Sequence, residues 1–156
     1  MLHGLARRWR TARALTWAER RLMAEAIGLL SVTTLALRLF GFQRTQAALT
    51  RADRTPRAVP GERRLAAPKI AAIVAAAGRY SIGRPKCLPQ ALVLQRLMRR
   101  QGLPAELRIG VRPQEDNIEA HAWVECDGVV FDVAGGGYRG FVPFEQEITT
   151  GPRGAS

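Results

Sequence analysis

The spacing of the apolar residues changes once along this chain, near Pro104, and this change limits the possible folds more than any other feature. Before it, Ile70, Ile73, Val74 and Ala77 recur at the spacing of one helix face. After it, apolar and polar residues alternate, as they do in a half-buried strand. Helices followed by a small antiparallel sheet predict the α+β fold class.

Three helices are expected before this change. Thr16 and Glu19 in "TWAE" have the spacing of a capping box, which predicts a first helix over about residues 17–40. A proline near the start predicts a second helix over residues 68–78 and a third over about 88–101.

The length of the chain suits one compact domain with a helical extension. Gly41 should close the first helix, and the stretch that follows it is rich in Pro and Arg, which indicates a linker or a loop over a neighbouring surface. We therefore expect a helical extension and linker in residues 1–60, the main domain in residues 61–148 and a loose tail in residues 149–156.

The expected sheet begins with a strand over residues 105–112, in which apolar and polar side chains alternate. Asp127 and Gly128 then form a strong signal for a two-residue turn. Residues 119–126 and 129–133 should pair across this turn as a β-hairpin.

The formal net charge of +11 indicates a partner of opposite sign. No zinc-finger or RNA-binding motif places aromatic residues among the basic ones, so we do not expect nucleic acid as the partner. An acidic peptide or a polyanionic surface fits the charge equally well.

The uncharged run between Glu25 and Arg38 is shorter than the roughly 20 residues of a membrane span. A buried or surface-bound helix is expected, with contact to a membrane surface as the lesser alternative.

The chain has only two cysteines, Cys87 and Cys126. Two cysteines are too few for a disulfide framework, although a single bridge between them stays open at this point. We take both thiols as reduced, as they are in the cytoplasm.

The predicted hairpin separates Cys126 from His121. One face carries Cys126 among apolar side chains, and the other carries His121, Trp123 and Asp132. On that second face His121 and Asp132 are diagonal neighbours within hydrogen-bonding reach. A carboxylate that holds one imidazole nitrogen leaves the other free to act as a base. Trp123 is expected to form a wall of this site or to pack in the core.

Cys87 has the properties of the missing nucleophile. It begins the third predicted helix, whose unpaired N–H groups and dipole favour a thiolate, and Arg84 and Lys86 add positive charge. The same N–H groups can stabilise an oxyanion. A buried and inert thiol is the alternative reading of this position.

The segments "KCLPQALVLQRLMRRQGLPAELRIGV", "HAWVE" and "DGVVFDV" resemble the leader peptidase of lasso-peptide biosynthesis, the protease part of the B protein, within the transglutaminase-like and papain-like superfamily. The resemblance covers about residues 70–144. It implies a papain-like/transglutaminase-like fold, with N-terminal helices followed by a catalytic helix and a small antiparallel sheet. It also implies that Cys87 is the nucleophile, His121 the base and Asp132 the orienting acid, with no cofactor or metal.

The resemblance further implies a cytoplasmic enzyme that cuts a ribosomal precursor peptide at the end of its leader. Ring closure by an ATP-dependent lasso cyclase would follow or accompany this cut. No β-rich recognition domain precedes Cys87 in this sequence, so a separate leader-recognition protein is expected as a partner.

Two other functions stay open. The same three residues suit transglutaminase-like acyl transfer to an amine. A non-enzymatic basic adaptor would instead bind an acidic peptide or a membrane surface through the Arg-rich N-terminal helix. A zinc site is not expected, because the candidate ligands are not paired at short spacing and Cys126 faces away from His121.

Overall fold

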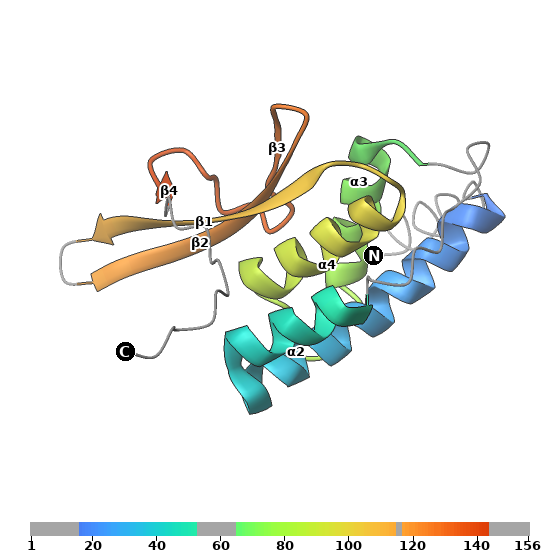
Figure 1. Cartoon of the computed structure of the whole chain (residues 1–156), viewed down its shortest axis with the longest axis horizontal. Helices are drawn as coiled ribbons and strands as arrows, with labels where there is room; N and C mark the ends of the chain where they lie inside the picture. Colours follow the sequence, from blue (N-terminus) through green and yellow to red (C-terminus); the bar gives the residue numbers. More distant parts are fainter. Residues whose placement is uncertain (1–15, 53–64, 115–116, 144–156) are drawn as a thin grey trace, which may run out of the picture.

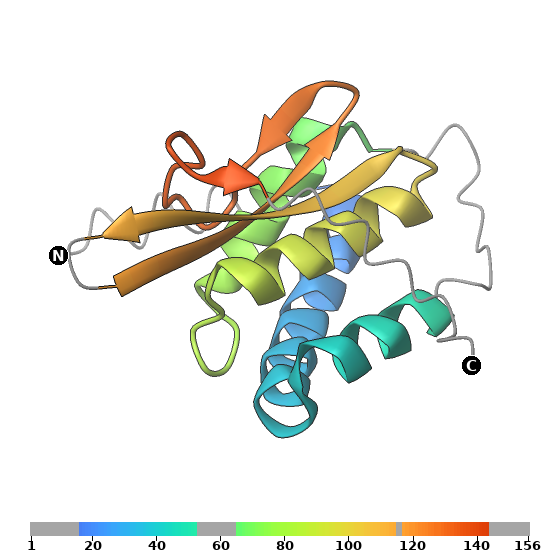
Figure 2. The ribbon, with the colours of Figure 1, turned by 60° about the vertical axis from the view of Figure 1, so that its left-hand side comes forward.

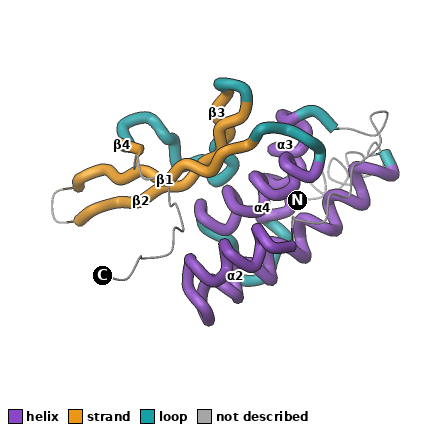
Figure 3. The backbone as a smooth tube through the Cα atoms, in the orientation of Figure 1, coloured by secondary structure: helices purple, strands orange, loops and turns teal. Residues whose placement is uncertain are grey.

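Three helices lie on one side of a small antiparallel sheet in the computed structural model, which describes residues 16–52, 65–114 and 117–143 (Figure 1). Figure 3 shows the same division into a helical and a stranded layer. The sheet order is β3-β2-β1-β4. The arrangement confirms the predicted α+β fold, while the predicted tail, residues 149–156, lies outside the described residues. The elements are α2 (Trp17–Ala52), α3 (Ala67–Gly78), α4 (Cys87–Arg100), β1 (Ala105–Gln114), β2 (Asn117–Cys126), β3 (Val129–Phe131) and β4 (Val142–Pro143). Helix α4 contacts the sheet, and α2 and α3 pack on α4.

The predicted capping box begins α2. The backbone N–H of Thr16 donates to Glu19 Oε2 at 2.7 Å, and the N–H of Glu19 donates to Thr16 Oγ1 at 3.3 Å. Glu19 Oε1 also lies 2.7 Å from Lys69 Nζ in α3. The cap of α2 therefore also connects the first two helices.

Gly41 interrupts α2 but does not end the helical segment. Its φ of 74° and ψ of 179° are not helical, yet the chain resumes a helix and continues to Ala52. Figure 2 shows this second half of α2 running in a new direction. Tertiary contacts hold it, since Thr45 is buried and Leu49 accepts a hydrogen bond from Arg96 of α4. The linker expected directly after Gly41 is thus helical as far as it is described.

Side chains from all three helices and from the sheet share one core. The four predicted face residues of α3 are buried, and α4 is buried more extensively because it lies between the other helices and the sheet. Leu94 and Met98 of α4 and Leu30 of α2 are fully buried in this core. The described part of the expected extension, residues 16–52, therefore packs on the main domain.

The hairpin has the predicted turn and register. Asp127 and Gly128 have φ values of 50° and 75°, as a two-residue hairpin turn requires. Cys126 pairs with Val129 and Val124 pairs with Phe131. Strand β3 ends at Phe131, two residues earlier than predicted, so Asp132 lies just beyond the strand.

Helix α2 also has the length and composition of a membrane-crossing helix, with a mean hydropathy of 1.6 in its most apolar part. Core helices of soluble proteins and signal sequences meet the same criterion. The N-terminal half of α2 contributes Leu22, Ala26 and Leu30 to the core.

The pKa of Glu19 links the α2 cap to pH. The hydrogen bond from Lys69, and then that from the Thr16 backbone, hold the pKa of the Glu19 carboxyl below its ordinary value of 4.5. A carboxyl with a lowered pKa in the folded state stabilises the fold above its unfolded pKa, and this stabilisation is lost as the pH falls through the folded pKa. Glu19→Gln should therefore lower the melting temperature at neutral pH, and the deficit should shrink in acid below pH 4.5.

Thermal unfolding followed by circular dichroism over this pH range measures the effect. Glu106→Gln is the matched control, because Glu106 is 63% exposed in its pair with Arg108 and should change stability little. A Glu19→Gln deficit that is the same at neutral and at acidic pH would contradict the assignment.

Candidate active site

His121 and Asp132 meet at the end of the hairpin. His121 lies in the middle of β2, and its Nε2 is 3.0 Å from Asp132 Oδ1, with both side chains almost fully buried. Neither atom has a hydrogen-bond partner among the described residues, so the pair is a close polar contact and not a hydrogen bond. The structure thus brings together the two residues that the alternation of side chains along the hairpin strands places on one face. Nδ1 is the imidazole nitrogen that this contact leaves available.

A glycine-rich loop after β3 holds the pair in place. The N–H of Gly137 donates to Asp132 Oδ2 at 2.8 Å. A Cβ atom on Gly136 would lie only 2.9 Å from Cε1 and 3.3 Å from Nδ1 of His121, so this backbone lies against the ring. Sequence reasoning missed both glycines. Their signal was the run "GGG" that follows the candidate acid by three residues.

Two aromatic side chains enclose the imidazole. The ring centroid of His121 lies 5.2 Å from that of Phe141 and 6.2 Å from that of Trp123. Trp123 is buried and donates from Nε1 to Glu125 Oε1 at 3.0 Å. The guanidinium of Arg112 covers Phe141, with Cζ 4.6 Å from the ring centre. Trp123 therefore packs beside the pair, its role as a substrate wall stays a prediction, and Phe141 is a neighbour that the sequence did not indicate.

Cys126 belongs to the core and not to this site. Its side chain is 3% exposed and packs with Ala122 and Val124 on the helical side of the sheet. Burial, and then the charge of Asp127, raise the pKa of the Cys126 thiol above its ordinary value of 9.0. A thiol with a raised pKa is protonated at neutral pH and is a poor nucleophile.

Cys87 is the first residue of α4 and is partly exposed. No side chain caps the N-terminal turn of this helix. The preceding loop is fixed, because Gln90 Nε2 donates to the carbonyl of Pro85 at 2.8 Å. The position therefore offers a thiol beside uncapped backbone N–H groups, as a nucleophile at a helix start requires.

The thiol of Cys87 is not bonded to His121. The Cys87 side chain makes no hydrogen bond or ion pair with the described part of the chain, and it packs against the core on the helical side. His121 faces the other side of the sheet, since neighbouring residues of a strand alternate. The beginning of α4 nevertheless lies next to β2 in Figures 1 and 2. Strand β3 pairs only with residues 124–126, so this edge of β2 has no strand partner at His121.

The candidate residues do not form a metal site. Within residues 16–52, 65–114 and 117–143, no three His, Cys, Asp or Glu side chains are grouped so that they could hold an ion.

The two thiols should differ sharply towards alkylating reagents. In the folded protein iodoacetamide should modify Cys87, which is partly exposed, and spare Cys126, which is 3% exposed and has a raised pKa. Peptide mapping by mass spectrometry identifies the labelled residue. In urea both cysteines should react, and labelling of Cys126 first in the native protein would contradict the burial of that side chain.

Gly136 should tolerate no side chain. Alanine there would press on the ring of His121, so Gly136→Ala should destabilise the fold by about 1–3 kcal/mol and shift the imidazole resonances of His121. Only two histidines are present, so a two-dimensional NMR spectrum of the rings resolves the effect. Gly28→Ala is the control, because a Cβ there would meet nothing within 4 Å. Unchanged His121 resonances in a folded Gly136→Ala variant would show that the loop does not hold the ring.

One comparison with known proteins identifies a family for this chain. The family described as "Transglutaminase-like superfamily" matches residues 29–145, from the middle of α2 to beyond β4. No curated protein and no solved structure gives a significant match. Because the matched residues make up more than half of the chain and include both cysteines, the hairpin and the glycine loop, this chain belongs to the transglutaminase-like superfamily.

Proposed function

We propose that this chain is a cysteine peptidase that removes the leader from a ribosomally made lasso-peptide precursor. The observation that carries the proposal is the buried contact between His121 Nε2 and Asp132 Oδ1 at 3.0 Å. Its superfamily includes cysteine peptidases and acyltransferases. The finer assignment to leader removal is supported by the resemblance of the "KCLPQ", "HAWVE" and "DGVVFDV" segments to lasso leader peptidases.

In the first half of the proposed reaction, His121 Nδ1 takes the proton of the Cys87 thiol. The thiolate attacks the scissile carbonyl carbon, and the uncapped N–H groups at the start of α4 stabilise the oxyanion. Asp132 keeps the imidazole oriented and stabilises its charged form. The imidazolium then protonates the leaving amine, which is the new N-terminus of the core peptide.

In the second half, the leader is held on Cys87 as a thioester. His121 takes a proton from water, the resulting nucleophile attacks the thioester carbonyl, and the leader leaves with a free carboxylate. The thiol of Cys87 is thereby restored. No step requires a cofactor or a metal.

The proposal requires Sγ of Cys87 to reach Nδ1 of His121. The proposal places their meeting at the edge of β2 beside His121, which β3 leaves without a strand partner. Binding of the precursor and of a separate leader-recognition protein would favour that approach. We place the reaction in the cytoplasm, ahead of ring closure by an ATP-dependent lasso cyclase.

Cleavage of a precursor peptide in the presence of its recognition protein tests the proposal. Cys87→Ala should abolish cleavage, and His121→Ala should slow it by about 10²–10⁴-fold, since a general base is lost. Liquid chromatography with mass detection measures both products. Cys126→Ala is the matched control and should keep its activity once circular dichroism confirms folding, because Cys126 lies in the core.

Retained cleavage by Cys87→Ala would overturn the assignment of the nucleophile. Product masses separate hydrolysis from acyl transfer, because water adds to the leader in the first reaction and an amine adds in the second. If the protein neither cleaves a peptide nor transfers it to an amine, and the Cys87→Ala variant still binds peptide, the adaptor function is favoured.

A further inference from the structure

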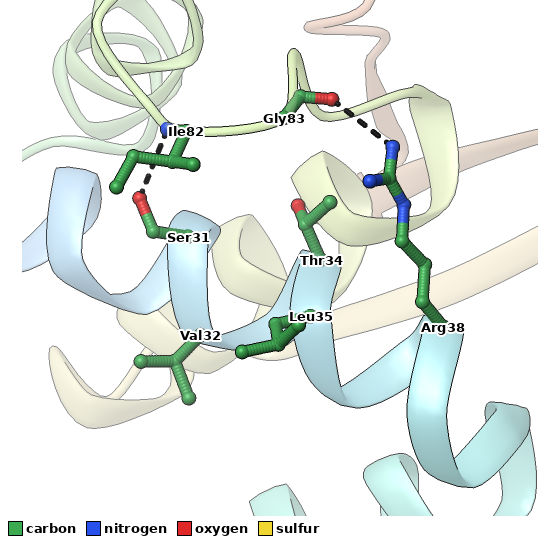
Figure 4. Close-up of a pocket in the computed structure, with 7 residues that line it drawn as sticks. All are labelled: Ser31, Val32, Thr34, Leu35, Arg38, Ile82 and Gly83. Carbon is green, nitrogen blue, oxygen red and sulfur yellow. Dashed lines mark hydrogen bonds between the residues drawn. The ribbon is translucent and has the colours of Figure 1, made fainter.

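An apolar groove lies between α2 and the loop that precedes α4. A hollow of about 210 Å³ separates the middle of α2 from the loop that joins α3 to α4, and most of its surface is formed by apolar atoms. Figure 4 shows Val32 and Leu35 of α2 below Ile82 of the loop, with Arg38 at one end. We call this hollow the α2 groove.

The apolar side chains of the α2 groove are exposed and are not part of the hydrophobic core. Val32 is 66% exposed, Leu35 57% and Ile82 81%. On α2 the exposed residues continue at helical spacing to Leu39, so they form one stripe that leads away from the hollow. An exposed apolar patch of this kind on a folded chain indicates an interaction surface.

The two walls of the groove are fixed to each other. Ser31 Oγ accepts the N–H of Ile82 at 3.2 Å, and the carbonyl of Gly83 accepts from Arg38 at 3.5 Å (Figure 4). Gly83 has a φ of +83°, and a Cβ there would lie 3.3 Å from Thr34. The groove is therefore formed before any partner binds, which reduces the ordering cost of binding.

The groove shares a loop with the candidate nucleophile. Its upper wall, Ile82 and Gly83, belongs to the same loop that enters α4 at Cys87. Gln90 of the first turn of α4 binds this loop at Pro85, so wall and thiol are held on one segment. A peptide that binds in the groove therefore contacts the loop that leads into Cys87.

The charge around the groove selects the partner. Arg38 lines it, Arg84 and Lys86 are exposed on its loop, and none of its lining residues is acidic. The exposed stripe of α2 by itself would also suit a membrane surface. The hollow, however, is concave and contains Ser31 and Thr34, which suits a single apolar side chain of a peptide.

We propose that the α2 groove binds the substrate peptide through an apolar side chain that is flanked by carboxylates. This inference rests on the proposed peptidase function and adds a substrate class to it. Peptides with bulky apolar residues next to Asp or Glu should be preferred over their basic counterparts.

Two fluorescein-labelled peptides of equal length, one of Leu and Glu and one of Leu and Lys, probe the groove by fluorescence anisotropy. Cys87→Ala protein is used, so that binding is measured without cleavage. The Leu–Glu peptide should bind more tightly, and Leu35→Gln and Ile82→Gln should each weaken it by about tenfold, the loss expected for one apolar side chain. Arg38→Glu should reverse the preference between the two peptides.

Ile118→Gln is the matched control, because Ile118 is 74% exposed on β2 and is not part of the groove. Equal binding by Leu35→Gln, Ile82→Gln and the control, or no binding of either peptide, would overturn the inference. Leu35-dependent binding to phosphatidylglycerol vesicles instead of peptide would assign the face to a membrane, and Leu35-dependent self-association would assign it to a second copy.

Precursor cleavage distinguishes this inference from the proposed function. In the protein with Cys87 intact, the groove variants should raise KM and leave kcat unchanged. Cleavage that depends on Cys87 with an unchanged KM would reject the groove and keep the peptidase. Groove-dependent peptide binding without any cleavage would reject the peptidase and keep the groove.

Discussion

The burial of α4 between the other helices and the sheet is the constraint on which the rest of the structure depends. Leu94, Leu97 and Met98 are almost completely removed from solvent, and they contact a core that includes side chains of α2, α3, β1 and β2. Because α4 is fixed on both sides, its first residue, Cys87, has a defined position at the rim of the core. The loop before it is fixed as well, and with it the α2 groove.

The sheet separates two environments. Its helical side carries Cys126 and other apolar residues of the main core, and its outer side carries His121 under the loop that leads to β4. The two-residue turn at Asp127 and Gly128 sets this division, because a register shift by one residue would exchange the faces. The same turn therefore decides which cysteine is inert.

The outer layer is small and closely packed. Gly110 lies opposite His121 in β1, and a Cβ there would lie 2.7 Å from Trp123 and 3.0 Å from Phe141. Glycine at 110 and at 136 thus lets aromatic rings and backbone close around the imidazole. Such packing excludes water from the contact with Asp132, and a polar contact is stronger where water is excluded.

The sequence by itself determined the order of helices and strands, the α2 cap, the hairpin turn and the separation of Cys126 from His121. Each of these follows from local chemistry, namely hydrophobic period, capping and turn preference. Only the tertiary structure decided what depends on distant contacts. These are the continuation of α2 past Gly41, which packing against α4 stabilises, and the closure of the glycine loop over His121. The α2 groove belongs with them, because its two walls are far apart in the sequence and the residues of neither wall indicate that the other lies beside it.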